Sequence, residues 1–184
     1  MKRVIAYIDG FNLYHGLRSK CFPENHWDKP WRNYYWLDLE KWMGRYLKDG
    51  QTLAKIKYFT ARVSGDPDKE KRQSDFLDAI STLSCIKIIE GRYEPTKCIC
   101  RRCYWLNEMP NEKMTDVNIA VEMIRDAYCD AFDVAFLVSG DSDLTAPIVA
   151  IRELFPDKPV VLIFPPNRFS KSLSNNKLVM SGGG

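Results

Sequence analysis

Two aspartates follow a strongly apolar run in this sequence, and their type and spacing are suited to chemistry. Residues 134–138 are apolar, and a Ser-Gly pair separates them from Asp141 and Asp143. A continuous apolar run that ends in a turn signal is typical of a strand covered on both faces of a parallel α/β sheet. Ligands of such sheets bind at the carboxyl ends of the strands. We therefore expect both carboxylates at a ligand site, where their mutual repulsion favours a bound cation.

Asp9 occupies an equivalent position near the start of the chain. It ends the apolar run 4–8, and Gly10 permits a sharp turn into a helix expected over residues 11–18. Asn12 can reach the same space, although bonding to the local backbone is its alternative role. Each of these aspartates taken alone could instead be a helix N-cap. That alternative explains the pattern less well when several aspartates occupy equivalent positions.

A fourth carboxylate, Asp116, starts a helix expected over residues 116–128. Its alternative role is a favourable interaction with the helix N-terminus. If the first and fourth strands are neighbours, all four acids converge on one crevice. Such a cluster suits Mg²⁺ or Mn²⁺, because hard cations take oxygen ligands. These ions orient phosphate and generate a hydroxide nucleophile, so phosphodiester hydrolysis is the chemistry that the acids favour.

The elements that must position these acids alternate between strands and helices. That order favours a parallel sheet with helices on both faces and right-handed crossovers. The apolar runs and periodicities predict strands at 4–8, 52–63, 86–89, 133–139 and 159–164. They predict helices at 11–18, 37–47, 69–83, 116–128 and 144–154, with a further short helix at 169–173.

Length and composition predict a soluble, single-domain protein, and the cytosol is its expected location. The 184 residues are 45% hydrophobic and 28% charged, with a formal charge of +3, so a nucleic-acid partner must be held by a local patch. No apolar run approaches the roughly 20 residues of a membrane span. The basic N-terminus has too short an apolar stretch for a signal peptide. We expect one domain over residues 1–180, an insertion at about 93–110 and a flexible tail at 181–184.

Other nucleophilic schemes fit the sequence poorly. His15 and His26 are the only histidines, and neither has a serine or cysteine partner in a recognisable arrangement. The common glycine-rich phosphate loops are absent from the sequence. Phe11 stands where aspartyl-phosphate enzymes carry their second aspartate after the first strand.

Three stretches resemble the signature segments of NYN domains, which belong to the PIN-like superfamily of metal-dependent nucleases. They read Tyr-Ile-Asp-Gly-Phe-Asn-Leu-Tyr at 7–14, Lys-Met-Thr-Asp-Val-Asn-Ile-Ala at 113–120 and Leu-Val-Ser-Gly-Asp-Ser-Asp-Leu at 137–144. Phe-Thr-Ala at 59–61 and Gln73 also look like family features. In the middle stretch Met114 and Thr115 replace the usual glycine-containing sequence before the aspartate, which is itself kept.

This resemblance implies an α/β fold, a PIN-like three-layer α/β/α sandwich with a mainly parallel central sheet. It implies an endoribonuclease that hydrolyses RNA, expected to be single-stranded, with Mg²⁺ or Mn²⁺ as cofactor. The implied catalytic and metal-binding residues are Asp9, Asp116, Asp141 and Asp143, and the supporting polar residues are Asn12, Ser139 and Ser142. The alternative is a non-catalytic RNA-binding or protein-interaction module, and phosphatase action on small esters is a third interpretation.

A cysteine-bearing loop suggests a second, structural metal. Cys100 and Cys103 have the spacing of one zinc-ligand pair, and Cys98 is a third candidate ligand. The fourth ligand would come from Cys21, His26 or Cys85. The alternative is reduced thiols on an exposed loop.

Basic residues suggest where RNA is held. Arg92, Lys97, Arg101 and Arg102 give residues 92–103 a local charge of +3, with tyrosine and tryptophan interleaved. Lys71 and Arg72 at the start of a predicted helix are further candidates. A long surface loop is predicted over residues 21–35. Aromatic residues in it and directly after it could stack on bases or pack onto the body: Trp27, Trp31, Tyr34, Tyr35 and Trp36. For both basic groups a solvated surface is the alternative.

Overall fold

The computed structural model describes residues 1–18, 34–99, 102 and 106–174, and within these it leaves the side chains of 93–99 and 106–112 undescribed. Its centre is a five-stranded sheet in the order β3-β2-β1-β6-β7, and every neighbouring pair is parallel. The strands are β1 (Lys2–Asp9), β2 (Gln51–Thr60), β3 (Ile86–Glu90), β6 (Val134–Val138) and β7 (Val160–Ile163). The predicted α/β class with a parallel sheet is confirmed.

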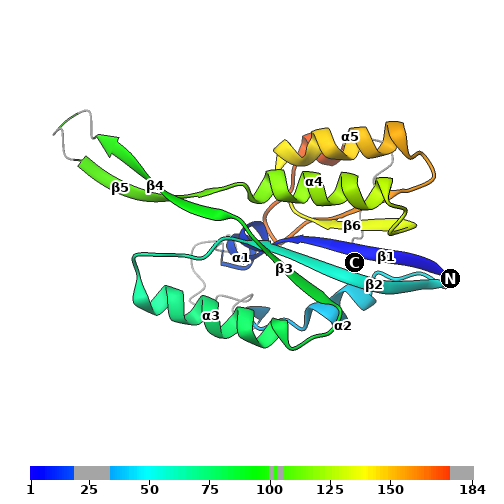
Figure 1. Ribbon diagram of the computed structural model, residues 1–184, viewed down its shortest axis with the longest axis horizontal. Helices are drawn as coiled ribbons and strands as arrows, with labels where there is room; N and C mark the ends of the chain where they lie inside the picture. The colour runs from blue at the N-terminus through cyan, green and yellow to red at the C-terminus, as the bar shows by residue number, and fades with distance from the viewer. Residues whose placement is uncertain (19–33, 100–101, 103–105, 175–184) are drawn as a thin grey trace.

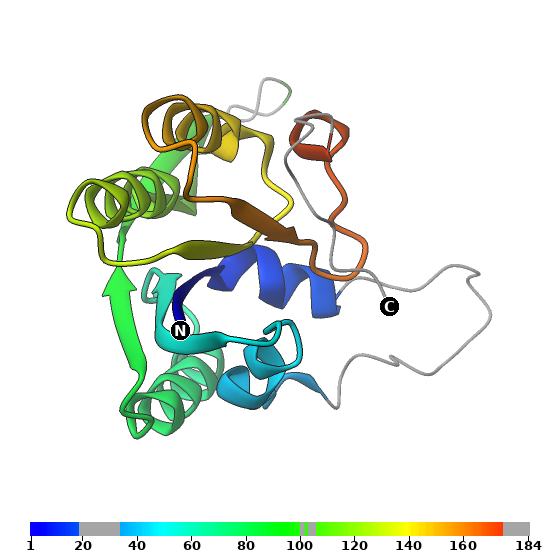
Figure 2. The same ribbon diagram turned by 90° about the vertical axis from the view of Figure 1, so that its right-hand side faces the viewer.

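Helices cover both faces of the sheet, as Figures 1 and 2 show. One layer contains α1 (Gly10–Arg18), α2 (Leu39–Gly44) and α3 (Pro67–Ser81), and the other contains α4 (Thr115–Tyr128) and α5 (Thr145–Leu154). A short 3₁₀ turn, η2 (Ser142–Leu144), precedes α5, and α6 (Lys171–Ser174) follows β7. The molecule is thus a three-layer sandwich.

Alternation along the central strand explains why two separate cores form. Val4, Ala6 and Ile8 of β1 belong to the core beneath α1–α3, whereas Ile5 and Tyr7 belong to the core beneath α4 and α5. Successive side chains of a strand point to opposite faces, so a strand buried on both faces must be apolar at every position. This is why β1 and β6 read as unbroken apolar runs.

Some predicted boundaries were wrong. The helix predicted at 37–47 is limited to α2, because backbone bonds of the turn type continue the chain from Trp42 to Leu47. The helix predicted at 144–154 begins as the separate 3₁₀ turn η2. Gly10 is the first residue of α1 and has no positive φ, so its role differs from the predicted turn. A Cβ there would lie 2.6 Å from the Tyr58 ring, and glycine is required for space.

The predicted insertion contains a two-stranded antiparallel ribbon, β4 (Arg92–Ile99) and β5 (Leu106–Lys113). Figure 1 shows this ribbon extending away from the five-stranded sheet. Cys98 therefore lies in β4 rather than in a loop, whereas Cys100 and Cys103 lie outside the described residues. The zinc prediction concerns residues whose side chains are not described.

A buried ionic cluster joins the sheet to α4. Lys57 of β2 has a side chain only 5% exposed, and its Nζ lies 2.5 Å from both Glu122 Oε2 and Asp126 Oδ2. The Tyr7 hydroxyl donates to Asp126 Oδ2 at 2.7 Å, and Arg125 donates to Glu122 at 2.6 Å. Each buried charge therefore has an opposite charge in contact, as burial of ions requires.

Across the described ranges, no helix is both long enough and apolar enough to cross a bilayer.

Candidate active site

The first and fourth predicted strands are neighbours, and this brings the acidic segments together. Ile8 of β1 is paired with Val138 of β6, so Asp9 and Ser139 emerge side by side at the carboxyl edge of the sheet. Ser139 Oγ donates to Asp9 Oδ2 at 2.9 Å, and it accepts from the backbone N–H of Asp141 at 3.1 Å. The buried Ser139 hydroxyl thus ties both acidic segments into one unit.

Asn12 makes a second tie between the same segments. Its backbone N–H donates to Asp9 Oδ1 at 2.9 Å, and its side-chain oxygen accepts from the backbone N–H of Gly140 at 3.0 Å. The Asn12 side chain therefore reaches the segment after β6, which differs from the local bonding considered as its alternative. Both oxygens of Asp9 are held, which fixes the orientation of that carboxylate.

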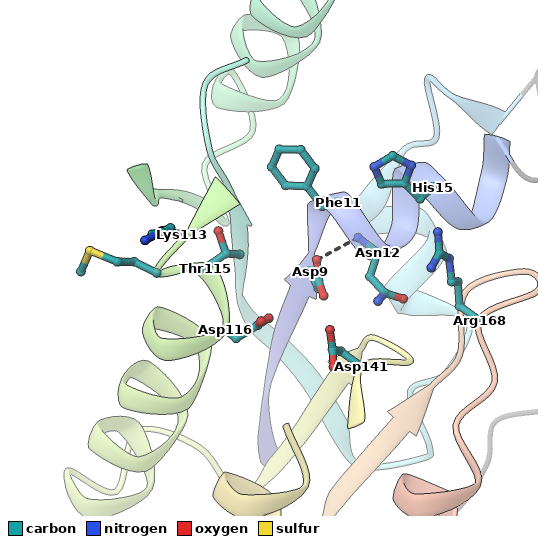
Figure 3. A pocket seen from close by; sticks show the side chains of 10 residues that line it. Asp9, Phe11, Asn12, His15, Lys113, Thr115, Asp116, Asp141 and Arg168 are labelled. Carbon is teal, nitrogen blue, oxygen red and sulfur yellow. Dashed lines mark hydrogen bonds between the residues drawn. The ribbon is translucent and has the colours of Figure 1, made fainter. Parts of the chain in front are cut away.

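A pocket of about 180 Å³ lies at this edge of the sheet. Its polar lining includes Asp9, Asn12, Thr115, Asp116 and Asp141, which come from β1, α1, α4 and the turn after β6. Figure 3 shows the carboxyl groups of Asp9, Asp116 and Asp141 directed toward one another. Three of the four aspartates singled out from the sequence thus share one space.

The fourth aspartate lies at the edge of this space. Asp143 and Ser142 are exposed in η2 and do not line the pocket. The backbone N–H of Asp143 donates to Asp141 Oδ1 at 3.0 Å, so Asp141 is an N-cap as well as a pocket residue. The charge of Asp143 still reaches the site, because it raises the pKa of Asp116.

The electrostatics of the pocket favour a cation. Burial raises the pKa of Asp9 to about 6, against the hydrogen bonds from Asn12 and Ser139 that lower it, and Asp116 and Asp141 raise it further. The pKa of Asp116 is also raised, first by burial and then by Asp141 and Asp143. Each carboxylate would be more easily ionised if a positive charge lay among them.

The donor set fits a hard divalent ion. Carboxylate oxygens are the ligands that Mg²⁺ and Mn²⁺ prefer. The buried Thr115 hydroxyl has no hydrogen-bond partner among the described residues, and it lines the same pocket. In the described part of the chain, no group of three or more His, Cys, Asp or Glu side chains is already arranged to hold a metal. The carboxylates of the pocket thus face one space without forming a closed ligand set.

Thr115 and the remaining lining residues were not predicted as site residues, although Phe11, Lys113 and Met114 lie in the stretches that carry the family resemblance. The remaining lining residues are Phe11, His15, Lys113, Met114 and Arg168. Lys113 and Arg168 place two cations in the same pocket as the three carboxylates. The pKa of His15 is lowered, first by burial and then by Arg168 and Arg18, so the imidazole is neutral near pH 7. Only the spacing of Phe11 and His15, one helical turn apart, could have indicated a shared face.

Met114 stands where the signature stretch usually has glycine, and its backbone conformation shows why glycine is usual there. It precedes α4 with φ of 76°, in the left-handed region that glycine adopts without steric cost. The glycine that is usual in this stretch therefore suits the backbone, and here a methionine holds the same conformation at the rim of the pocket.

We expect Gly140→Ala to destabilise the site by displacing the turn at 165–168. A Cβ at Gly140 would lie 1.6 Å from the Arg168 carbonyl oxygen, so backbone must move. Overpacking of this kind costs about 1–3 kcal/mol. Urea unfolding should show that loss, whereas Gly44→Ala, with nothing within 4 Å of its Cβ, should stay within about 1 kcal/mol of wild type. Equal stability of the two variants would contradict the contact.

Among the described side chains, none of the predicted basic residues lines the pocket. Arg92 and Arg102 are exposed, and the side chains of Lys97 and Arg101 are not described. Lys71 and Arg72 are exposed on α3, where Lys71 forms an ion pair of 3.4 Å with Asp75. For Lys71 the solvated-face interpretation fits, and the role of the other cations in RNA binding stays a prediction.

Comparisons with known proteins identify the family and the fold of this chain. A sequence profile described as NYN domain matches residues 3–178. The chain is 28% identical, over 185 aligned residues, to 6-hydroxy-3-succinoylpyridine 3-monooxygenase HspA of Pseudomonas putida, with 82% of this chain and 55% of that protein covered. The chain thus spans about half the length of this relative. A crystal structure of a protein of unknown function from Vibrio parahaemolyticus has the same fold, with a TM-score of 0.61, 18% identity and coverage of 99% of this chain and 93% of that one.

Proposed function

Because the chain belongs to the NYN domain family, whose fold is that of PIN-like nucleases, we propose that it is a metal-dependent endoribonuclease. Its substrate is RNA, and the reaction is hydrolysis of a phosphodiester bond. One observation carries the proposal: Asp9, Asp116 and Asp141, far apart in sequence, line a single pocket. Asp143 at its edge completes the acidic set.

The protein's own residues prepare this site. Ser139 and Asn12 fix both oxygens of Asp9, and the N-cap bond orients Asp141. These side chains would hold Mg²⁺ or Mn²⁺, which supplies Lewis acidity and a hydrolytic water at neutral pH. The unpartnered Thr115 hydroxyl can accept or donate a hydrogen bond inside the same pocket.

The test is incubation with end-labelled single-stranded RNA in Mn²⁺, in Mg²⁺ and in chelator. We expect shortened products with either metal and none with chelator, because without a cation the acids repel the phosphodiester and no metal-bound water is available to attack it. Products formed equally in chelator would contradict metal dependence.

A mobility shift without products in any metal would favour the non-catalytic RNA-binding module. A chromogenic phosphate monoester should stay intact, and its turnover would favour a phosphatase.

The name of the Pseudomonas putida relative gives a second candidate, oxidation of a heteroaromatic acid. Aromatic and cationic residues of the pocket, Phe11, His15 and Arg168, would suit such a ring and its carboxylate. We favour hydrolysis because three carboxylates of the pocket offer the oxygen ligands that a hard divalent ion prefers, and such an ion supplies a hydrolytic water. Incubation with 6-hydroxy-3-succinoylpyridine, a reductant and oxygen would decide the matter, and consumption of that compound would overturn the preference.

A further inference from the structure

One side of the pocket differs in chemistry from the carboxylates. Figure 3 shows Phe11, His15 and Arg168 on this side, with Asp9, Asp116 and Asp141 grouped beside them. Phosphodiester hydrolysis explains the acids but gives no role to two aromatic rings and a guanidinium group. A second function for this side of the pocket has to account for the aromatic rings and for the guanidinium group.

The two rings are held nearly parallel on α1. Phe11 and His15 lie one turn apart, with ring centroids separated by 6.3 Å and an interplanar angle of 26°. Tyr14 packs its edge against His15 at 5.5 Å. Both rings of the pair line the pocket, so they offer an aromatic surface beside the acids.

Arg168 is presented by a defined turn after β7. The backbone N–H of Arg168 donates to the Pro165 carbonyl at 3.1 Å, Pro166 follows, and Asn167 has φ of 57°. Proline at the second position, a left-handed third residue and this hydrogen bond are the features of a type II turn. The Arg168 backbone also touches Gly140, so the turn is fixed against the acidic segment.

The Arg168 guanidinium has no carboxylate partner within ion-pair distance among the described residues, although it is one of the cations of the pocket. Arginine binds phosphate well because its planar group presents several N–H donors. An arginine on a defined turn, with no carboxylate partner among the described residues, is therefore placed to bind a phosphate group beside the acids.

We propose that Phe11, His15 and Arg168 form a nucleotide-binding subsite beside the carboxylates. Arg168 binds a phosphate next to the one that is cleaved, and the two rings receive the face of the adjoining base. This subsite rests on the proposed function. It also defines the substrate class, because a base can stack on side chains only where it is unpaired. Single-stranded RNA therefore binds, and the duplex of the same sequence does not fill the subsite.

The first test measures binding of a fluorescent single-stranded RNA 10-mer by anisotropy, with chelator present to prevent cleavage. Arg168→Gln should weaken binding about 10-fold, as loss of a charged hydrogen bond does. It should also reduce the slope of log affinity against log salt concentration by about 0.7, the value for one phosphate contact on a single strand. Arg152→Gln, on the last turn of α5 and outside the pocket, should change neither by more than twofold.

The second test separates the base from the phosphate. Phe11→Leu should weaken single-strand binding about 10-fold with an unchanged salt slope, because stacking is lost and the charges stay. Tyr128→Leu, which removes an 80% exposed aromatic ring from the end of α4, is the matched control and should bind like wild type. Wild type should prefer the single strand to the duplex, and Phe11→Leu should lose that preference.

The outcomes distinguish this subsite from the nuclease proposal. Metal-dependent cleavage by wild type together with unchanged binding and salt slope in Arg168→Gln and Phe11→Leu would overturn the subsite alone. The expected binding losses without any metal-dependent cleavage would keep the subsite and overturn the nuclease. A loss in Arg168→Gln with an unchanged salt slope would assign that residue a structural role and overturn its phosphate contact.

Discussion

Asp141→Asn is expected to lower Mn²⁺-dependent RNA cleavage by about 10³-fold while the fold stays intact. A catalytic metal stabilises the transition state by several kcal/mol, and each 1.36 kcal/mol corresponds to a factor of ten in rate. The amide that replaces the carboxylate is neutral and is a weaker ligand for a hard cation. The loss should appear in the rate of product formation at saturating metal.

Stability should separate this effect from unfolding. An asparagine side chain can still accept the 3.0 Å hydrogen bond from the backbone N–H of residue 143, so the N-cap remains. Removal of one negative charge also relieves Asp116, whose pKa Asp141 raises. Thermal unfolding of the metal-free variant should therefore occur at or above the wild-type temperature, and added Mn²⁺ should raise it less than in wild type.

The matched control is Asp157→Asn, an exposed aspartate outside the pocket. It should cleave RNA at the wild-type rate. Undiminished cleavage by Asp141→Asn would remove Asp141 from the mechanism, and a large loss in both variants would indicate a general charge effect.

The convergence of Asp9, Asp116 and Asp141 could be predicted from the sequence because the signals for it are local. Each of Asp9 and Asp141 follows a buried apolar run, and such a run identifies both a strand and its carboxyl end. The pairing of β1 with β6 was the remaining assumption, and the register of Ile8 with Val138 confirms it. Asp143 shows the limit of this reasoning. It lies only two residues after Asp141, in η2, yet it does not line the pocket.

Arg168 could not be predicted because nothing in its neighbourhood repeats. It follows two prolines and an asparagine in a segment without helical or strand periodicity, and its position depends on contact with Gly140. The sequence around His15 indicates only that it lacks a partner for nucleophilic catalysis, whereas the structure makes it part of a ring pair with Phe11. Such contacts depend on tertiary packing that single-sequence patterns do not contain.

Lys57 shows the same limit in the core. Lysine in a strand is usually placed on a solvated face, yet this side chain lies between β2 and α4 with Glu122 and Asp126. Those acids lie four residues apart on one helical face, but their partner is more than sixty residues away. Charge complementarity over that distance depends on the tertiary fold, which places β2 against α4.

We expect Lys57→Met to lower the free energy of unfolding by about 3–5 kcal/mol, because it leaves two buried carboxylates without their common partner. Tyr7 cannot compensate, since its hydroxyl donates only to Asp126. Arg125 contacts Glu122 from a half-exposed position, and Asp126 lies 3.9 Å away from it. The measurement is urea unfolding at pH 7.

Lys55→Met on the same strand is the matched control, because Lys55 is exposed and should change stability by no more than about 0.5 kcal/mol. The combined variant Lys57→Met, Glu122→Gln, Asp126→Asn should regain much of the loss, since neutral amides cost less to bury than unpaired charges. Equal effects of the two lysine substitutions would show that the cluster contributes nothing beyond ordinary surface charge. A full loss that the combined variant does not relieve would instead assign the effect to packing of the lysine stem.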